Sequence, residues 1–217
     1  MAGEKVSSRL VLVLTLRAGT ANELVQQIRG MGDAVATVVL ETGQTQPVSP
    51  PELAETVAAI QALGIATLIA ADAGLARVVK ADGVHLPASK TALSSYREAR
   101  EILGSRFIVG IDVGRTRHDG MVLGEEGADY IAFGIPSHVE DRETARARRL
   151  ELIRWWSEIF EPPCVAFNVE TPEDARDLAA AGADFIAVHP PEALPAASLK
   201  DFLLPFAASL TSVAAPT

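Results

Sequence analysis

Short apolar runs alternate with longer amphipathic segments along the whole chain of 217 residues. The runs are rich in Val, Ile and Leu with few polar residues, which is typical of strands that are buried on both faces. Strands covered by helices on both faces form parallel sheets. The runs predict eight strands: Leu10–Leu16, Val35–Leu40, Ile65–Ala70, Gly83–Leu86, Phe107–Ile111, Tyr130–Phe133, Cys164–Phe167 and Phe185–Val188.

A segment of helical periodicity follows each strand. The predicted helices are Asn22–Met31, Pro51–Leu63, Leu75–Lys80, Leu93–Leu103, Met121–Glu126, Ala145–Ile159, Pro172–Ala181 and Ala197–Leu210. Thr171-Pro172-Glu173-Asp174 supplies a capping Thr, a Pro at the first helical position and early carboxylates, which together indicate a helix start. A glycine follows several of the helices, where a left-handed terminator is needed: Gly64, Gly104, Gly127 and Gly182.

Two strands are entered through the same short sequence. Gly-Ala-Asp precedes an aromatic residue at 127–130 and again at 182–185, and Ala81-Asp82-Gly83 is a weaker third copy. The recurrence indicates one strand–helix unit used many times. Eight such units predict a single-domain (β/α)8 TIM barrel over residues 1–217, with its core at about 9–211. A doubly wound sheet is the competing fold, and the lack of a G-x-G-x-x-G motif after the first strand disfavours its dinucleotide-binding form.

Composition excludes several classes of protein. The net charge of −9 opposes nucleic-acid binding, and the 5% aromatic content argues against a base-stacking surface. The single Cys164 excludes an internal disulfide and a multi-cysteine zinc site. The run Leu10–Leu16 is too short to span a bilayer, and its β-branched residues favour a core strand over a signal peptide. We therefore expect no membrane partner and a cytoplasmic location.

Four segments resemble the thiamine phosphate synthase and thiazole tautomerase family. They are the strand motif at 81–86 (ADGVHL), the strand motif at 127–134 (GADYIAFG), the pair of segments 163–166 (PCVA) and 171–175 (TPEDA), and the entry at 182–188 (GADFIAV). The resemblance runs from about residue 60 to 190. It implies a barrel with transferase activity in thiamine biosynthesis, one that joins a pyrimidine diphosphate to a thiazole phosphate with Mg²⁺, or that isomerises the thiazole.

The resemblance places the metal and diphosphate groups at residues that only partly match. Asp72 stands where the family has a metal-binding Asp, and a carboxylate suits Mg²⁺; a helix-capping role for Asp72 is an equal alternative. Lys90 stands where a second metal carboxylate is expected, and it could fill the negative pocket itself by pairing with Asp72. Glu41 and Gly43 replace a basic pair. These departures weaken the implied Mg²⁺ and diphosphate sites.

The loops after the fifth and sixth strands also differ from the family at positions that the resemblance assigns to substrate binding. Asp112 replaces a Ser and would repel a diphosphate, and Gly114 replaces the His that the resemblance implies for thiazole isomerisation. In the sixth-strand loop, Arg142 falls on a Lys and keeps one cation. His138 lies in the same loop, where a solvated role competes with substrate binding.

The phosphate-binding turns are the most altered part of the resemblance. The family uses Gly-Gly after the seventh strand and Ser-Gly after the eighth, where this chain has Asn168-Val169 and Pro190-Pro191. Proline has no N–H, and side chains hinder the close backbone approach that an amide cradle requires. Asn168 and His189 can still offer side-chain hydrogen bonds, as a different kind of site.

Three hypotheses follow from these residues. The first is a divergent enzyme with Asp72 and Arg142 as catalytic residues and with substrate contacts from Lys90, Asp112, His138, Asn168 and His189. The second is a silent binding or regulatory relative, and the third is an ordinary synthase. The first predicts a small-molecule ligand at the carboxyl ends of the strands, where barrel sites lie. The second uses Trp155-Trp156 or the basic run from Arg142 to Arg154 as its contact surface. A homo-oligomer is compatible with each.

Two further residue groups receive structural interpretations. The arginine-rich segment from Arg142 to Arg154 predicts a solvated helix face. His85, within the 81–86 motif, is predicted to fill the barrel interior.

Overall fold

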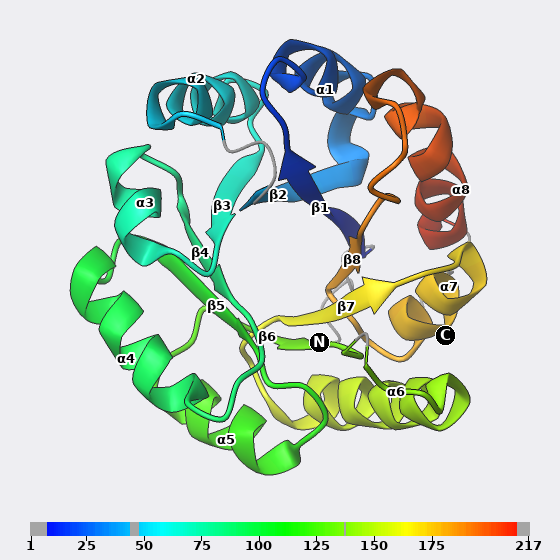
Figure 1. Ribbon diagram of the computed structural model, residues 1–217. Helices are drawn as coiled ribbons and strands as arrows, with labels where there is room; N and C mark the ends of the chain where they lie inside the picture. Colours follow the sequence, from blue (N-terminus) through cyan, green and yellow to red (C-terminus); the bar gives the residue numbers. More distant parts are fainter. Residues whose placement is uncertain (1–7, 44–47, 137, 212–217) are drawn as a thin grey trace, which may run out of the picture.

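Eight parallel strands close into a barrel in the computed structural model, which describes residues 8–43, 48–136 and 138–211 (Figure 1). The strands pair in chain order and β1 closes the barrel against β8. They are β1 (Arg9–Leu16), β2 (Val35–Thr42), β3 (Ala66–Ala70), β4 (Gly83–Leu86), β5 (Ile108–Asp112), β6 (Tyr130–Phe133), β7 (Cys164–Val169) and β8 (Phe185–Val188). The predicted TIM barrel is confirmed.

Helices surround the barrel as an outer ring (Figure 1). They are α1 (Ala21–Arg29), α2 (Pro50–Gln61), α3 (Ala73–Val78), α4 (Ala92–Leu103), α5 (Arg117–Glu125), α6 (Arg142–Ile159), α7 (Pro172–Ala180) and α8 (Leu199–Thr211), with short 3₁₀ turns at Gly32–Ala34 and Ala196–Ser198. Over the described residues, none of these helices combines the length and apolarity that a membrane crossing requires.

Two helices begin earlier than their apolar periodicity predicts. α5 starts at Arg117 because the Thr116 hydroxyl accepts a hydrogen bond from the Asp119 amide at 3.2 Å. α6 starts at Arg142, where the Asp141 carboxylate accepts from the Thr144 amide at 3.0 Å. Side-chain caps of this kind satisfy amides that have no partner within the helix. Each of these two helices therefore begins with a polar, capped turn that precedes its first apolar residues.

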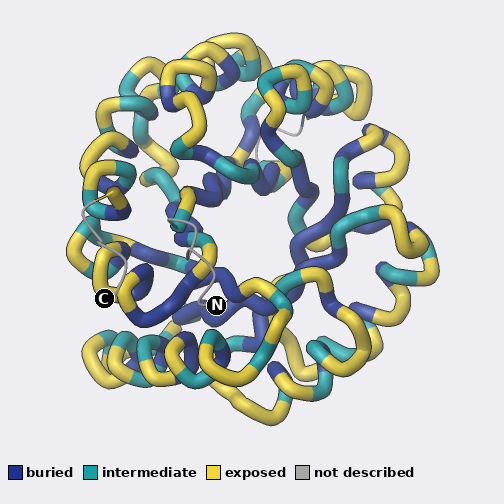
Figure 2. Tube along the Cα trace, turned by 180° about the vertical axis from the view of Figure 1, so that it is seen from behind, coloured by how far each residue is buried: buried dark blue, intermediate teal, exposed yellow. Residues whose placement is uncertain are grey.

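The strands bury both of their faces (Figure 2). In β1, Leu10, Leu12 and Leu14 belong to the cluster shared with the helices, whereas Val11 and Val13 belong to the cluster inside the barrel. This alternation follows from the two-residue period of a strand. Both faces being apolar explains why the strands read as continuous hydrophobic runs.

The barrel interior is packed around His85, as predicted. This side chain is 4% exposed, its Nδ1 lies 2.8 Å from the Tyr130 hydroxyl, and its ring stacks on Phe167 with centroids 4.3 Å apart. Burial, followed by the charge of His189, lowers the pKa of His85 to about 3. The Tyr130 ring takes the space beside Gly110, where an added Cβ would lie 1.9 Å from it. His85 is therefore a neutral packing group.

The amino-terminal rim of the barrel carries one hydrogen-bonding device three times. One Asp precedes each of β4, β6 and β8, and it bonds to both the N–H and the C=O of a single residue in the preceding strand. These residues are Asp82, Asp129 and Asp184. The carboxylates accept from backbone amides at 2.7, 2.7 and 2.8 Å, and the aspartate amides donate to the carbonyls of the same residues. The partners are Thr67, Val109 and Cys164. We call these the three aspartate clamps.

Candidate functional site

A cleft of about 520 Å³ opens at the carboxyl-terminal rim of the barrel. The end of β7, the loops after β6, β7 and β8, and the first residue of α6 form its wall, and α8 supplies one aromatic side chain. Its lining residues are Ile135, Arg142, Asn168, Val169, Glu170, His189, Pro191 and Phe202. Three of the predicted site residues, Arg142, Asn168 and His189, are therefore brought together.

Asp112 is the last residue of β5 and is 7% exposed. Its Oδ1 accepts hydrogen bonds from the amides of Gly114 at 2.7 Å and Gly134 at 3.1 Å. Burial raises the pKa of Asp112 to about 6, and the two amides and the Arg149 charge oppose that rise. A carboxyl with such a pKa exchanges its proton near neutral pH, which suits acid–base chemistry.

Gly134, just after β6, separates Asp112 from Asn168. A Cβ placed on Gly134 would lie 2.3 Å from Asp112 Oδ2 and 2.8 Å from Asn168 Oδ1. Both oxygens therefore approach the same point over the glycine. Only a residue without a side chain leaves room for both groups at this place.

Asn168 holds a left-handed backbone conformation, with φ of 57°. Asn adopts this conformation more readily than most residues, although glycine adopts it best. The backbone at Asn168 therefore follows a path that a glycine would also take.

Arg149 fixes the backbone on either side of that turn. Its Nη1 donates to the Phe167 carbonyl at 2.6 Å and to the Asn168 carbonyl at 3.2 Å, and its Nη2 pairs with Asp174. The residue is 1% exposed, so the predicted solvated face is wrong for Arg149. Burial lowers the pKa of Arg149, and Asp174 opposes this.

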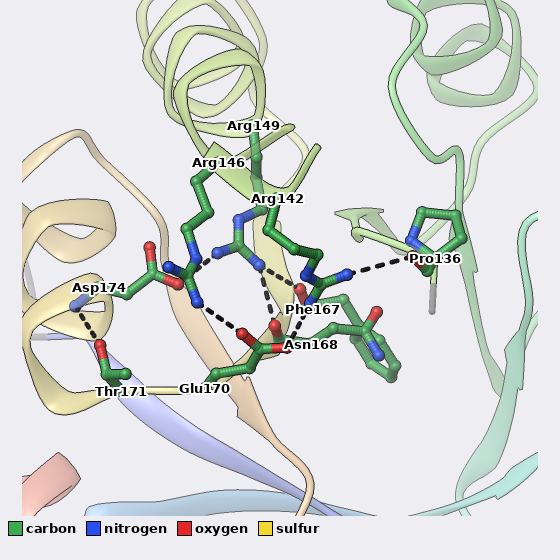
Figure 3. Close-up of polar contacts among 9 residues, drawn as sticks. All are labelled: Pro136, Arg142, Arg146, Arg149, Phe167, Asn168, Glu170, Thr171 and Asp174. Atoms are coloured by element: carbon green, nitrogen blue, oxygen red, sulfur yellow. Dashed lines mark hydrogen bonds and ion pairs between the residues drawn. The ribbon is translucent and has the colours of Figure 1, made fainter. Parts of the chain in front are cut away.

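Arg142 and Arg146 lie beside Arg149 on α6 and point toward the loop after β7 (Figure 3). Both pair with Glu170, Arg146 at 2.6 Å, and Arg142 also donates to the Pro136 carbonyl at 3.2 Å. The Glu170 carboxylate therefore offsets the charge of the cation that the sequence predicts for the site. Arg142 lines the cleft as part of an ion-pair network.

His189 follows β8, and its ring meets Phe167 edge-on with centroids 5.3 Å apart. Its Nδ1 is buried and has no hydrogen-bond partner among the residues that the structure describes. Burial lowers the pKa of His189, and the Glu41 charge opposes that change. A buried nitrogen without a partner is costly, so it marks a place where a bound molecule can supply the missing bond.

The remaining predicted residues lie apart from the cleft lining. Asp72 caps α3, because its Oδ1 accepts from the Leu75 amide at 2.8 Å. Lys90 and His138 are exposed. The predicted Lys90–Asp72 ion pair is not found among the described residues, so the idea that Lys90 replaces the metal is wrong.

The described side chains offer little protein ligation for the implied Mg²⁺. Asp72 already uses one oxygen to cap a helix, and in residues 8–43, 48–136 and 138–211 no three His, Cys, Asp or Glu side chains gather where they could hold a metal ion. A magnesium ion commonly keeps several waters and takes one or two carboxylates together with substrate phosphates. A Mg²⁺ site built mainly from protein side chains is therefore not found in the part of the chain that the structure describes.

Comparison with known proteins agrees with the motifs and with the barrel. The family model for thiamine monophosphate synthase matches residues 11–190. This chain belongs to the thiamine monophosphate synthase family. A thiamine-phosphate synthase of Erythrobacter litoralis is 36% identical to this family member over 193 residues, which cover 87% of this chain and 89% of the relative. One of Rhodospirillum centenum is 42% identical over 149 residues, covering 66% and 70%.

A solved structure extends the comparison of this family member to three dimensions. Thiamine phosphate pyrophosphorylase from Pyrococcus furiosus superposes with a TM-score of 0.70 over 96% of this chain and 98% of that protein. The sequence identity is 19%, so the superposition shows the shared fold. This family member therefore shares the barrel of that protein over nearly its whole length.

Two functional contributors escape prediction from the sequence. In the sequence, Arg149 is one of several arginines expected on an exposed helix face. In the fold, its side chain donates to the Phe167 carbonyl of β7. In the sequence, Gly134 is the last residue of a strand motif. Its contacts with Asp112 and Asn168 arise only when the barrel closes. The spacing of Arg142, Arg146 and Arg149 along one helix face was the available signal, since residues three and four apart are neighbours on a helix.

Proposed function

We propose that this family member acts on a small, weakly phosphorylated or unphosphorylated molecule at the carboxyl-terminal rim, and does not join a pyrimidine diphosphate to a thiazole phosphate. The observation that carries the proposal is the set of groups that line the cleft or lie against its lining. The acidic Asp112 lies beside the lining residue Asn168, and the lining cation Arg142 is paired with Glu170. Such a rim favours a neutral or cationic ligand.

The electrostatics oppose the ordinary synthase reaction. That reaction releases a diphosphate, whose developing charge needs cations and amide donors arranged in advance. Here the amide donors at the base, Gly114 and Gly134, are already bonded to Asp112. Pro190, Pro191 and Pro195 remove three further amides from the loop after β8. Each tenfold in rate corresponds to about 1.4 kcal/mol of transition-state stabilisation, so losing several such contacts is severe.

Proton transfer is the chemistry that we infer for groups at and beside the cleft. Burial lowers the pKa of His189, which lines the cleft and whose Nδ1 has no partner among the described residues, and burial raises the pKa of Asp112, which lies beside the lining residue Asn168, to about 6. Two titratable groups whose environments shift their pKa values differently can serve as acid and base in one reaction. A binding or regulatory protein is the second candidate, and the open cleft serves it equally well.

Two measurements test the proposal. We expect no thiamine phosphate above background when the protein is supplied with both precursors and Mg²⁺. In thermal unfolding, we expect the midpoint to rise with the unphosphorylated pyrimidine and to be unchanged by pyrophosphate with Mg²⁺, since a ligand stabilises the state that binds it. A Mg²⁺-dependent rise with pyrophosphate, or product formation, would restore the synthase assignment.

A further inference from the structure

Two hydrogen-bond acceptors meet at one point of the rim with no donor between them. Asp112 Oδ2 and Asn168 Oδ1 lie 2.3 and 2.8 Å from the position of a Cβ on Gly134. The two amide donors that reach Asp112 both bond to Oδ1, which leaves Oδ2 for other partners. Within the part of the chain that the structure describes, the Asn168 side chain makes no hydrogen bond either.

The Asn168 side chain is held in place through its own backbone. Arg149 donates to the carbonyls of Phe167 and Asn168, and its Nη2 is committed to Asp174. The guanidinium therefore orients the turn without donating to either acceptor. It also sets the left-handed φ of 57° from which the Asn168 carboxamide projects.

We propose that Asp112 and Asn168 form an acceptor pair that recognises an N–H-bearing group of the ligand, such as an aromatic amine, an amidine or an ammonium. This inference rests on the proposed function and names its ligand class. An NH₂ or NH₃⁺ group carries two or more donors and can bridge two oxygens, whereas an ionised carboxylate or sulfate offers no donor. The bond to an ionised Asp112 is charge-assisted, which makes it the stronger of the two.

The surrounding charges favour the same class of ligand. The groups that face Asp112 are Arg149 from α6 and Tyr130 from β6. Arg149 is paired with Asp174, and Asp112 helps to raise the pKa of Tyr130, which keeps that hydroxyl neutral. On ionisation Asp112 therefore adds a charge without a dedicated counter-ion, which a cationic ligand supplies.

Isothermal titration with small probes tests the acceptor pair. Benzamidine and 4-aminopyrimidine carry the proposed donors, and benzoate and inorganic sulfate are anionic probes without hydrogen-bond donors. We expect the first two to bind and the last two to show no saturable heat. Benzamidine affinity should rise as the pH increases through about 6, because Asp112 ionises over that range.

Two substitutions locate the binding. Asp112→Asn keeps the shape and removes the charge, and we expect benzamidine affinity to fall at least tenfold. Asn168→Gly removes the second acceptor and suits the left-handed turn, so it should fold and still lose binding. Glu192→Gln is the control, because it removes one charge at the same end of the barrel from a side chain that is 74% exposed.

The outcomes separate this inference from the proposed function. If the N–H probes bind wild type and both variants equally, or do not bind at all, the acceptor pair is wrong. A carboxamide of Asn168 turned so that its NH₂ donates to Asp112 would give that result, because the two groups would satisfy each other. Synthesis of thiamine phosphate, measured separately, overturns the proposed function instead.

Discussion

The two rims of this barrel are built from the same strands and obey different rules. At the amino-terminal rim, the three aspartate clamps repeat one geometry in chemically identical form. At the carboxyl-terminal rim, the residues that end the strands differ from one another. Asp72 caps a helix, Asp112 is buried over a glycine, and His189 has a nitrogen without a partner.

The difference separates residues that the barrel's own backbone satisfies from residues that it leaves partly unsatisfied. The hydrogen-bonding groups of a clamp are all satisfied by the barrel's own backbone. Any strand preceded by an Asp at this position can therefore form one. The carboxyl-terminal groups are only partly satisfied by the protein. Barrel enzymes place their chemistry at this end, and buried polar groups without partners concentrate at functional sites.

The largest expected effect concerns Arg149, which joins the rim to α7. Arg149→Met removes the bonds to two carbonyls and leaves Asp174 without its partner. Breaking a buried pair by removing one member costs about 3–5 kcal/mol of unfolding free energy. Urea unfolding measures the loss. Arg148→Met, at a side chain 39% exposed, should change stability by less than about 1 kcal/mol.

The second prediction concerns the pH dependence at Asp112. Its pKa in the fold is raised from 3.8 to about 6, so the folded state holds a proton that the unfolded state has released between these values. Stability from this group is full below about pH 3.8 and is lost as the pH rises through 6, by roughly 3 kcal/mol. Asp112→Asn should remove that slope and be more stable than wild type at pH 8. Equal pH profiles for the two proteins would contradict this.

The third prediction concerns a clamp at the opposite rim. Asp184→Ala removes the carboxylate that accepts from the Cys164 amide. A hydrogen bond to a charged group contributes about 1.5–3 kcal/mol, and we expect a loss of that size in urea unfolding. Ligand affinity should stay unchanged, because the clamp lies at the far end of the barrel. Asp177→Ala, at an exposed carboxylate, is the control.

The smallest expected effect concerns backbone strain near the site. Ala71, just after β3, has φ of 61°, which is unfavourable for an alanine. Ala71→Gly should stabilise the fold by about 1 kcal/mol, offset in part by the greater entropy of the unfolded glycine. Asn168→Gly should gain less, because Asn tolerates this conformation better. Thermal unfolding of the two variants side by side measures the difference.

The residues that repeat along the chain made the barrel predictable. Gly127 and Gly182 have positive φ, and the Asp residues that follow them by two form clamps, so the Gly-Ala-Asp recurrence reported a real structural unit. The alternation of Val and Leu in β1 likewise matched two buried faces. These features depend on local geometry, which a short segment of sequence carries within itself.

The site was less predictable because its contacts join distant segments. Asp112 and Asn168 are far apart in the chain and meet only through Gly134, and neither spacing nor residue type signals that contact. Asp72 had two equal interpretations, and the cap that it forms decides its position without testing a role with substrate. The sequence predicts Arg142 as a cation of the site, but it does not predict the ion pair with Glu170 that offsets this charge.

The clamps also continue around the amino-terminal rim. They tie β4 to β3, β6 to β5 and β8 to β7, and the carbonyls of Asp82 and Asp184 accept from the Ile108 and Arg9 amides at the entries of β5 and β1. Segments joined in this way open together rather than singly. Amide exchange should therefore be slower at this rim than at the opposite end, where the cleft lies over β7, β8 and their border with β6.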